Sequence, residues 1–99
     1  MKLWVDDVRP APEGYDSQAF SVNQAKNCII ECEDDNKPIE LIDIDHDAGD
    51  YASDGGDYIK LLDWLEETGR NYPIHIHSMN NVGVANMRSI IKKNGWVEV

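Results

Sequence analysis

The chain has 99 residues, a hydrophobic fraction of 41% and a formal net charge of −10 at pH 7. This length suits one domain with a single hydrophobic core, and we expect that domain to cover residues 1–99. An acidic surface repels nucleic-acid phosphates, so the charge argues against binding of duplex DNA or RNA. No apolar run resembles a membrane span or a secretory signal, so we expect a cytoplasmic protein that does not bind membranes.

The first half of the chain predicts a strand, a loop, a short strand and a helix. Lys2–Val5 is apolar, "VRPAPEGYDS" is rich in loop residues, and "QAFS" is a short strand candidate. Ser21 and Gln24 have the spacing of a capping box, which predicts that a helix begins there. Apolar residues then recur at helical spacing, at Val22, Ala25, Ile29 and Cys32. Cys28 and Cys32 share one face of this helix, so we expect reduced packing residues rather than a disulfide.

The second half predicts two further strand–helix pairs and a terminal strand. The segment 39–44 is apolar on both faces, as in a buried parallel strand. A helix follows, with Tyr58, Leu61, Leu62 and Leu65 on one face and Gly69 as its stop. "PIHIHS" is the next strand, "NNVGVANMRSIIKKNG" the next helix and "WVEV" the last strand. This alternation predicts an α/β fold with a doubly wound parallel sheet.

Acidic and histidine side chains follow the predicted strands where each strand ends. Asp6 and Asp7 follow the first strand, "DHD" from Asp45 the third, and "HSMN" from His77 the fourth. In such sheets ligands bind outside the carboxyl ends of the strands. Carboxylates that converge there repel one another unless a cation joins them. The oxygen-rich ligand set suits Mg²⁺, or Mn²⁺ if a histidine participates. The predicted metal ligands are Asp6, Asp7, Asp45 and Asp47.

Several of these residues also have ordinary structural explanations. A single aspartate at a strand end is more often a loop former or helix cap. We therefore expect Asp43 to be hydrogen-bonded inside its strand, and Asp54 and Asp57 to begin a helix. His75 lies in the middle of a strand, where a packed histidine is the more frequent case. His46 and His77 fit a structural role and a site role equally well.

The order of these residues resembles that of response-regulator receiver domains. Those domains have an acid pair after the first strand, a phosphoacceptor aspartate after the third, and Ser or Thr after the fourth. The resemblance places these roles on Asp6 and Asp7, on Asp45 and on Ser78. Two features depart from the pattern: a proline-rich loop replaces the first helix, and the lysine and helix expected after the fifth strand are missing.

Three segments resemble more closely the receiver-like family described as cyclic-phosphate processing receiver domains. They are "LWVDDVRPAPEG", "DIDHDAG" and "IHSMNNVGVANM". The resemblance implies a compact, flavodoxin-like sheet of five strands in the order 2-1-3-4-5, with about three helices and truncated relative to a standard receiver. It also implies processing of a cyclic or terminal phosphate on a nucleotide, another phosphorylated small molecule or an RNA end.

The leading functional prediction is a metal-dependent phosphoesterase that uses Mg²⁺ or Mn²⁺. Its predicted phosphate-binding residues are Arg9, Ser78 and Asn80, and its predicted catalytic residues are Asp45, His46, His77 and Ser78. A regulatory alternative is a degenerate receiver, or a phosphate-binding module, with Asp45 as phosphoacceptor. A third alternative is a partner-binding domain whose acids are vestigial.

Overall fold

The computed structural model describes all residues of the chain and contains four strands, three α-helices and one 3-10 helix. In chain order these are β1 (Lys2–Val5), β2 (Ser17–Ala19), α1 (Val22–Asp34), β3 (Leu41–Ile44), η1 (Gly49–Ser53), α2 (Ile59–Glu67), β4 (Ile74–Ile76) and α3 (Asn81–Asn94). No helix combines the length and the apolar character that a membrane span requires. Cys28 and Cys32 are both free thiols.

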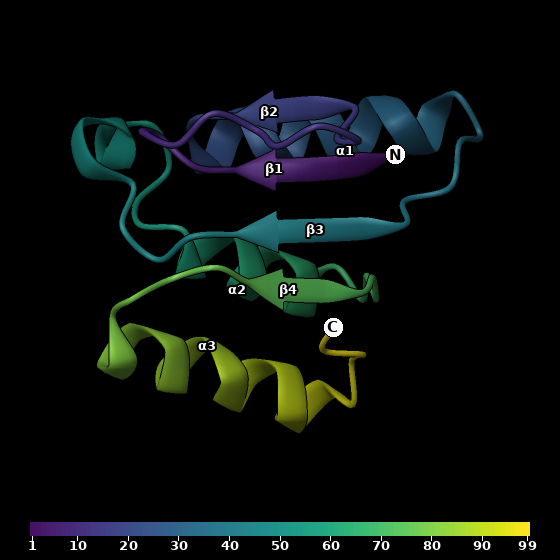
Figure 1. Cartoon of the computed structure of the whole chain (residues 1–99). Coiled ribbons are helices and arrows are strands. Elements are labelled where there is room, and N and C mark those ends of the chain that lie inside the picture. The colour runs from purple at the N-terminus through teal and green to yellow at the C-terminus, as the bar shows by residue number, and fades with distance from the viewer.

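All four strands are parallel and form one sheet in the order β2-β1-β3-β4 (Figure 1). Trp4 of β1 is paired with Asp43 of β3, which is paired with His75 of β4. The carboxyl ends of the strands therefore lie along one edge of the sheet. The segments that follow β1, β3 and β4, which carry the predicted site residues, begin at that edge (Figure 1).

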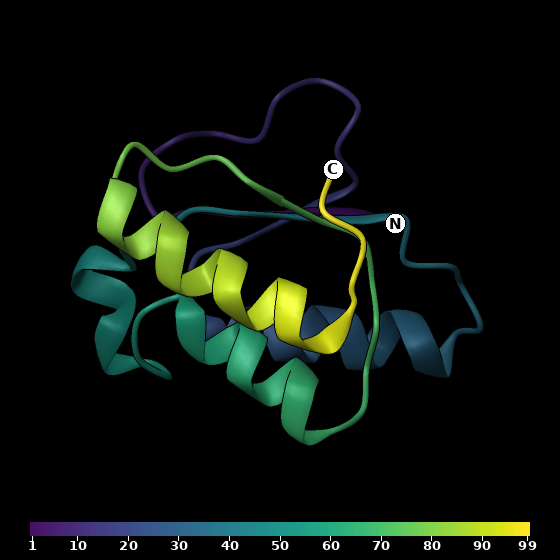
Figure 2. The ribbon, with the colours of Figure 1, turned by 90° about the horizontal axis from the view of Figure 1, so that it is seen from below.

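The sheet carries helices on one side and a loop on the other, so the predicted doubly wound arrangement is wrong. Helices α1 and α2 lie against one face and α3 packs against α2, while residues 6–16 cross the other face (Figure 2). The β1–β2 connection runs along the sheet in the opposite direction to the β2–β3 and β3–β4 connections. Because parallel crossovers are right-handed, it therefore lies on the opposite face of the sheet. Pro10 and Pro12 disfavour a helix in that connection, so the second layer is only a loop.

The predicted fifth strand is reduced to a single bridge, which corrects the five-strand order. Ile74 forms an isolated parallel bridge with Glu98, and its backbone bonds to Val97 and Val99 at 2.9 and 2.8 Å. The terminal segment therefore lies beside β4, where the fifth strand was expected. Helix α3 ends only at Asn94, and Gly95 follows it in the left-handed region at φ 68°.

The alternation of strand residues divides the two faces of the sheet. Leu3, Val5, Ile42, Ile44 and Ile74 are fully buried and belong to the core beneath the helices. Trp4, Asp43 and His75 alternate with them and therefore point to the other face. Only loop 6–16 covers this second face, whereas helices cover the first (Figure 2). The polar side chains of the sheet therefore lie on the second face.

The caps of α1 and α3 follow the sequence signals, whereas α2 begins without a side-chain cap. Ser21 caps α1 by accepting a hydrogen bond from the N–H of Gln24 at 3.1 Å. The Gln24 side chain accepts from the N–H of Phe20 at 2.9 Å, so the reciprocal half of the capping box reaches one residue further back. Asn80 caps α3 by accepting from the N–H of Gly83 at 3.0 Å. The cap fixes the β4–α3 connection beside the carboxyl edge.

Candidate metal and phosphate site

The carboxyl edge brings together three possible ligands from three different strands. Asp6 follows β1, Asp45 follows β3 and His77 follows β4. One ligand atom from each residue lies within 4.8 Å of the others. These residues are up to 71 positions apart in sequence, and the parallel register of β1, β3 and β4 is what joins them.

Asp6 is fully buried and held by three hydrogen-bond donors. Its Oδ1 accepts from the backbone N–H groups of Val8 and Arg9 at 2.9 and 3.0 Å, and its Oδ2 lies 2.9 Å from Nε2 of His77. Burial alone would raise the pKa of Asp6, but the hydrogen bonds outweigh it and the pKa is lowered. The carboxylate therefore stays charged and keeps a lone pair on Oδ2 for a further partner.

Asp7 and Asp45 are the uncompensated carboxylates of the site. Burial raises the pKa of Asp7, and the charges of Asp6, Asp45 and Asp50 raise it further. Asp45 accepts a hydrogen bond from the N–H of His46 at 2.8 Å, and neither Asp7 nor Asp45 forms an ion pair. Such carboxylates favour a bound cation, because only a cation removes the repulsion without protonating one of them.

The backbone of η1 lies directly against Asp7. Gly49 begins η1 with φ 56°, and a Cβ at this position would overlap Oδ2 of Asp7. The glycine of the "DHDAG" segment is therefore required both for its backbone conformation and for the space that the Asp7 carboxylate occupies.

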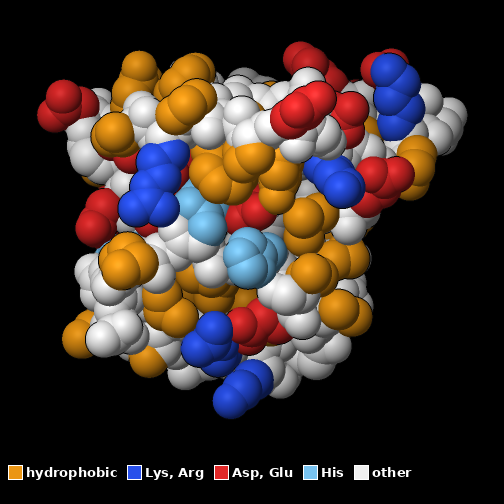
Figure 3. All heavy atoms as spheres, in the orientation of Figure 1, with side chains coloured by type: hydrophobic (Ala, Val, Ile, Leu, Met, Phe, Trp, Pro, Cys, Tyr) orange, Lys and Arg blue, Asp and Glu red, His pale blue; other side chains and the backbone are white.

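His77 lies between two buried acids. Its Nδ1 is 2.5 Å from Oδ1 of Asp43 and its Nε2 is 2.9 Å from Oδ2 of Asp6. The ring stacks on Trp4, with centroids 3.8 Å apart and 6° between the planes. Burial would lower the pKa of His77, but the hydrogen bonds to Asp43 and Asp6 outweigh it and the pKa is raised. In the space-filling view of this face, histidine side chains lie near the centre, with acidic and hydrophobic side chains around them (Figure 3).

Asp43 is hydrogen-bonded, as expected, but its partners connect it to the site. Besides His77, it accepts a hydrogen bond from the hydroxyl group of Tyr15. Tyr15 lies in loop 6–16, and its ring meets Trp4 edge-on at 5.3 Å. Sequence reasoning did not identify Tyr15, because a loop tyrosine without periodicity gives no signal for a contact 28 residues away.

His46 is the second histidine at the carboxyl edge. Its Nδ1 lies 2.9 Å from Oδ1 of Asp47 and 3.4 Å from Nδ2 of Asn80. A Cβ at Gly83 would overlap three atoms of the His46 ring, so the ring lies directly on the backbone of α3. His46 is therefore held one residue from Asp45 with its side chain 17% exposed.

We expect Gly83→Ala to destabilise the protein, although alanine normally stabilises a helix over glycine by about 1 kcal/mol. The new methyl group would displace the His46 ring or push α3 away from it. Thermal unfolding and the NMR signals of the His46 ring would measure both effects. The exposed Asn86 in the same helix offers a control, since Asn86→Ala should leave the ring signals unchanged. A stabilised Gly83→Ala protein with unchanged ring signals would contradict the packing described.

The remaining predicted site residues surround this centre without joining the ligand cluster. Asp47 is 69% exposed and contacts His46 rather than the other acids. Ser78 accepts a hydrogen bond from the N–H of Asn80 at 3.2 Å, and Asn80 caps α3. The backbone of Arg9 bonds to Asp6, Trp4 and Gln18, whereas its exposed guanidinium group has no hydrogen-bond partner.

The residues expected to be structural have partners outside the site. Asp54 accepts from the side chains of Ser21 and Asn23 at 2.6 and 3.0 Å, so it ties the loop to the start of α1 rather than beginning α2. Asp57 accepts from the N–H of Ala48 at 3.3 Å. His75 is half-buried, and its Nδ1 lies 2.6 Å from the carbonyl oxygen of Val99.

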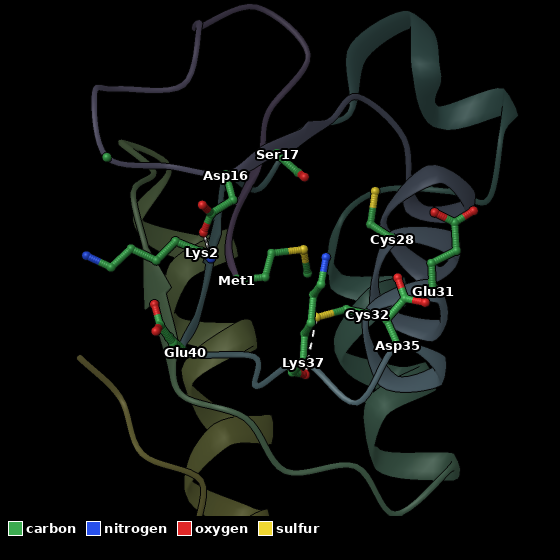
Figure 4. Close-up of a pocket in the computed structure, with 11 residues that line it drawn as sticks. Met1, Lys2, Asp16, Ser17, Cys28, Glu31, Cys32, Asp35, Lys37 and Glu40 are labelled. Atoms are coloured by element: carbon green, nitrogen blue, oxygen red, sulfur yellow. Dashed lines mark hydrogen bonds between the residues drawn. The ribbon is translucent and has the colours of Figure 1, made fainter.

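A pocket of about 630 Å³ lies at the opposite edge of the sheet (Figure 4). Met1, Lys2 and Glu40 from the amino ends of β1 and β3 line it, together with Cys28 and Cys32 of α1. It contains no histidine and none of the predicted site residues. Burial raises the pKa of the Cys28 thiol, so that group stays protonated. The convergent charges therefore place the candidate site at the carboxyl edge rather than in this pocket.

The donor set at the carboxyl edge fits a divalent cation. Asp6 and Asp45 offer hard carboxylate oxygens, and His77 adds an imidazole nitrogen. Asp7, also a predicted ligand, lies outside this three-residue cluster, although its carboxylate is close enough to feel the charges of Asp6 and Asp45. Carboxylates suit Mg²⁺ and Mn²⁺, and an imidazole ligand favours first-row transition metals over Mg²⁺.

Comparison with known proteins gives one family. No curated protein and no solved structure matches the chain significantly. Residues 1–93 match the family described as the cyclic-phosphate processing receiver domain. That match contains β1, the carboxyl edge and nearly all of α3. The chain therefore belongs to the cyclic-phosphate processing receiver domain family.

Proposed function

We propose that the carboxyl edge is a metal-dependent phosphoesterase site for a cyclic or terminal phosphate of a nucleotide, an RNA end or another phosphorylated small molecule. Asp6, Asp7 and Asp45 hold a divalent cation, Mg²⁺ or Mn²⁺. When bound, that ion neutralises phosphate charge and generates a nucleophile from water. In this scheme Asp45 is a ligand and forms no covalent bond to phosphorus.

Side chains around the ion bind and orient the phosphate. Arg9 lies two residues after Asp7, and its free guanidinium group binds phosphate oxygens. Nδ2 of Asn80 lies beside His46, so it can donate a hydrogen bond to the phosphoryl group. Ser78 sits in the same connection, half-buried and next to His77. The exposed Asp47 orients His46 instead of binding the ion.

The observation that carries this proposal is the placement of His46. Its ring rests on Gly83 and its Nδ1 faces Asp47, while the residue before it is Asp45. A histidine that is fixed next to a cation-binding carboxylate can transfer protons to and from an attacking water or a leaving oxygen. A module that only binds a cation or a phosphoryl group does not need a proton carrier at this position.

A substrate panel tests the proposal. The protein is incubated with cyclic nucleotides, linear nucleotides and acetyl phosphate, each with Mg²⁺, with Mn²⁺ and with a chelator. We expect turnover of at least one phosphoester that needs the metal ion and is lost in Asp45→Asn. If no substrate is turned over while acetyl phosphate modifies the protein, the phosphoesterase proposal fails.

We expect His46→Gln to lower kcat by about 10²- to 10⁴-fold, the usual contribution of a general acid or base. Metal binding should change little, because the His46 ring is not among the clustered ligand atoms. His75→Gln is the matched control, since the side chain of His75 forms its hydrogen bond with the terminal segment and not with the ligand cluster. Equal effects of the two substitutions would remove His46 from the mechanism.

A second candidate function is a receiver-like regulatory module, which membership of a receiver family favours. Asp45 directly follows β3 and accepts only one hydrogen bond, from the next N–H along the chain. Its carboxylate therefore has oxygen lone pairs available to attack a phosphoryl donor. In this scheme the domain takes a phosphoryl group on Asp45 and signals to a partner, without turnover of a phosphoester.

A further inference from the structure

His77 presents one ring nitrogen to the acid cluster and the other to a carboxylate behind it. Nε2 is 2.9 Å from Asp6, and Nδ1 is 2.5 Å from Asp43. Two neighbouring ligands that are each about 2.1 Å from an octahedral ion lie about 3 Å apart. The observed 2.9 Å between His77 Nε2 and Asp6 Oδ2 therefore matches the separation expected for two neighbouring ligands of one ion.

The groups behind His77 have the arrangement that supports a metal-binding histidine. Such a histidine usually donates its other N–H to a carboxylate, which fixes its tautomer and orients the ring. Asp43 occupies this position, and the hydroxyl group of Tyr15 donates to its second oxygen. Trp4 stacks on the ring and restricts its tilt. The side chains of His77 and Asp43 are only 10% and 5% exposed, so solvent competes little for these contacts.

We propose that His77 binds the cation through Nε2 beside Asp6 and Asp45, with Asp43 and Tyr15 as positioning residues behind it. The inference rests on the cation site of the proposed function and specifies its ligands. Because Mg²⁺ strongly prefers oxygen, a site with an imidazole ligand selects a first-row transition ion such as Mn²⁺ over Mg²⁺. In the competing arrangement His77 keeps its proton, stays bonded to Asp6 and touches no ion.

Pulsed electron paramagnetic resonance on the Mn²⁺-loaded full chain distinguishes the two arrangements. We expect hyperfine coupling from a directly bound ¹⁴N nucleus, replaced by ¹⁵N coupling in protein labelled with ¹⁵N-histidine. This measurement needs no substitution, so it does not depend on how well a variant folds. Mn²⁺ binding without nitrogen coupling would overturn the inference and leave the cation site intact. Binding of neither Mn²⁺ nor Mg²⁺ would remove the cation site itself.

Tyr15→Phe tests the positioning residues. Loss of a group that orients a metal ligand typically costs about 10- to 100-fold in metal affinity. We expect that loss for Mn²⁺ and a smaller one for Mg²⁺, so the preference for Mn²⁺ declines. Tyr72→Phe is the matched control, because the Tyr72 hydroxyl also donates to a carboxylate, that of Glu33, away from the site. An unchanged preference for Mn²⁺ in Tyr15→Phe, with the fold retained, would contradict the proposed role of Asp43 and Tyr15.

Discussion

Replacing His77 with alanine should lower the free energy of unfolding at neutral pH by about 3–5 kcal/mol, the usual cost of removing one partner of a buried ion pair. The side chains of Asp6 and Asp43 are 1% and 5% exposed, and His77 is the only basic group paired with either. Without His77, both carboxylates remain buried without a compensating charge. A loss of this size is a large share of the stability of a domain of this length.

His75→Ala is the matched control for this substitution. His75 lies two residues before His77, and its side chain hydrogen-bonds only to the terminal segment, so its loss should cost about 1 kcal/mol or less. Chemical denaturation of both variants, with a chelator present, makes the comparison. If both variants lose the same free energy of unfolding, His77 does not stabilise the buried carboxylates of Asp6 and Asp43.

The same contacts give the wild-type protein a predicted pH dependence in the presence of a chelator. The folded protein raises the pKa of His77 above 6.5, so its stabilisation is complete below that pH and is lost as the pH rises through the folded pKa. The folded protein lowers the pKa of Asp6 below 3.8, so this contribution is present above 3.8 and is lost as the pH falls through the folded pKa. His77→Gln should remove the loss of stability that occurs as the pH rises. If this loss is unchanged in the variant, other groups cause it.

Addition of a divalent cation should raise the stability of the wild-type protein by about 2.7 kcal/mol at one hundred times its dissociation constant. The physical reason is the repulsion among Asp6, Asp7 and Asp45, which burial strengthens and a cation removes. Thermal melts with Mn²⁺, with Mg²⁺ and with a chelator measure the effect. It should disappear in Asp45→Ala.

Asp7→Asn should stabilise the metal-free protein, because it removes a carboxylate whose pKa is raised by burial and by its neighbours. Glu67→Gln is the matched change of charge at an exposed helix position away from the site. If a metal ion stabilises Asp45→Ala as much as the wild type, or Glu67→Gln behaves like Asp7→Asn, the acids at the carboxyl edge are not a cation site.

Local patterns predicted much of this fold. The apolar runs placed β1, β3 and β4, the capping box at Ser21 placed the start of α1, and the segment "NNVGVANMRSIIKKNG" placed α3. The incorrect predictions, the fifth strand and the helices on both faces of the sheet, depend on contacts between distant segments. Nothing in "WVEV" indicates that only one bridge to Ile74 would form. The prolines after Asp7 were visible, but their consequence, a sheet with helices on one side, depends on how the whole chain is arranged.

The candidate site was predicted in part for a similar reason. The rule that parallel strands end at one edge was enough to expect Asp6 and Asp45 together, which is where the structure places them. Which acids remain uncompensated depends on long-range contacts. Asp6 is paired with His77, which follows β4, and Asp43 receives a hydrogen bond from Tyr15 in a loop. The hydrogen bonding of Asp43 was expected, but sequence spacing carries no information about its partners, so its contacts with Tyr15 and His77 were not predicted.

Mass spectrometry of Asp45 under turnover conditions tests the central claim most directly. The protein is exposed to acetyl phosphate with Mn²⁺ or Mg²⁺, and hydroxylamine traps any acyl phosphate that forms. The masses of the intact protein and of the peptide that contains Asp45 are then measured. Turnover of phosphoesters is followed in parallel samples. If Asp45 is a cation ligand and water is the nucleophile, no stable adduct forms and at least one cyclic or terminal phosphate is hydrolysed. A stoichiometric phosphoryl adduct at Asp45, with no turnover of any phosphoester, would contradict the account and show that the domain acts as a phosphorylated receiver.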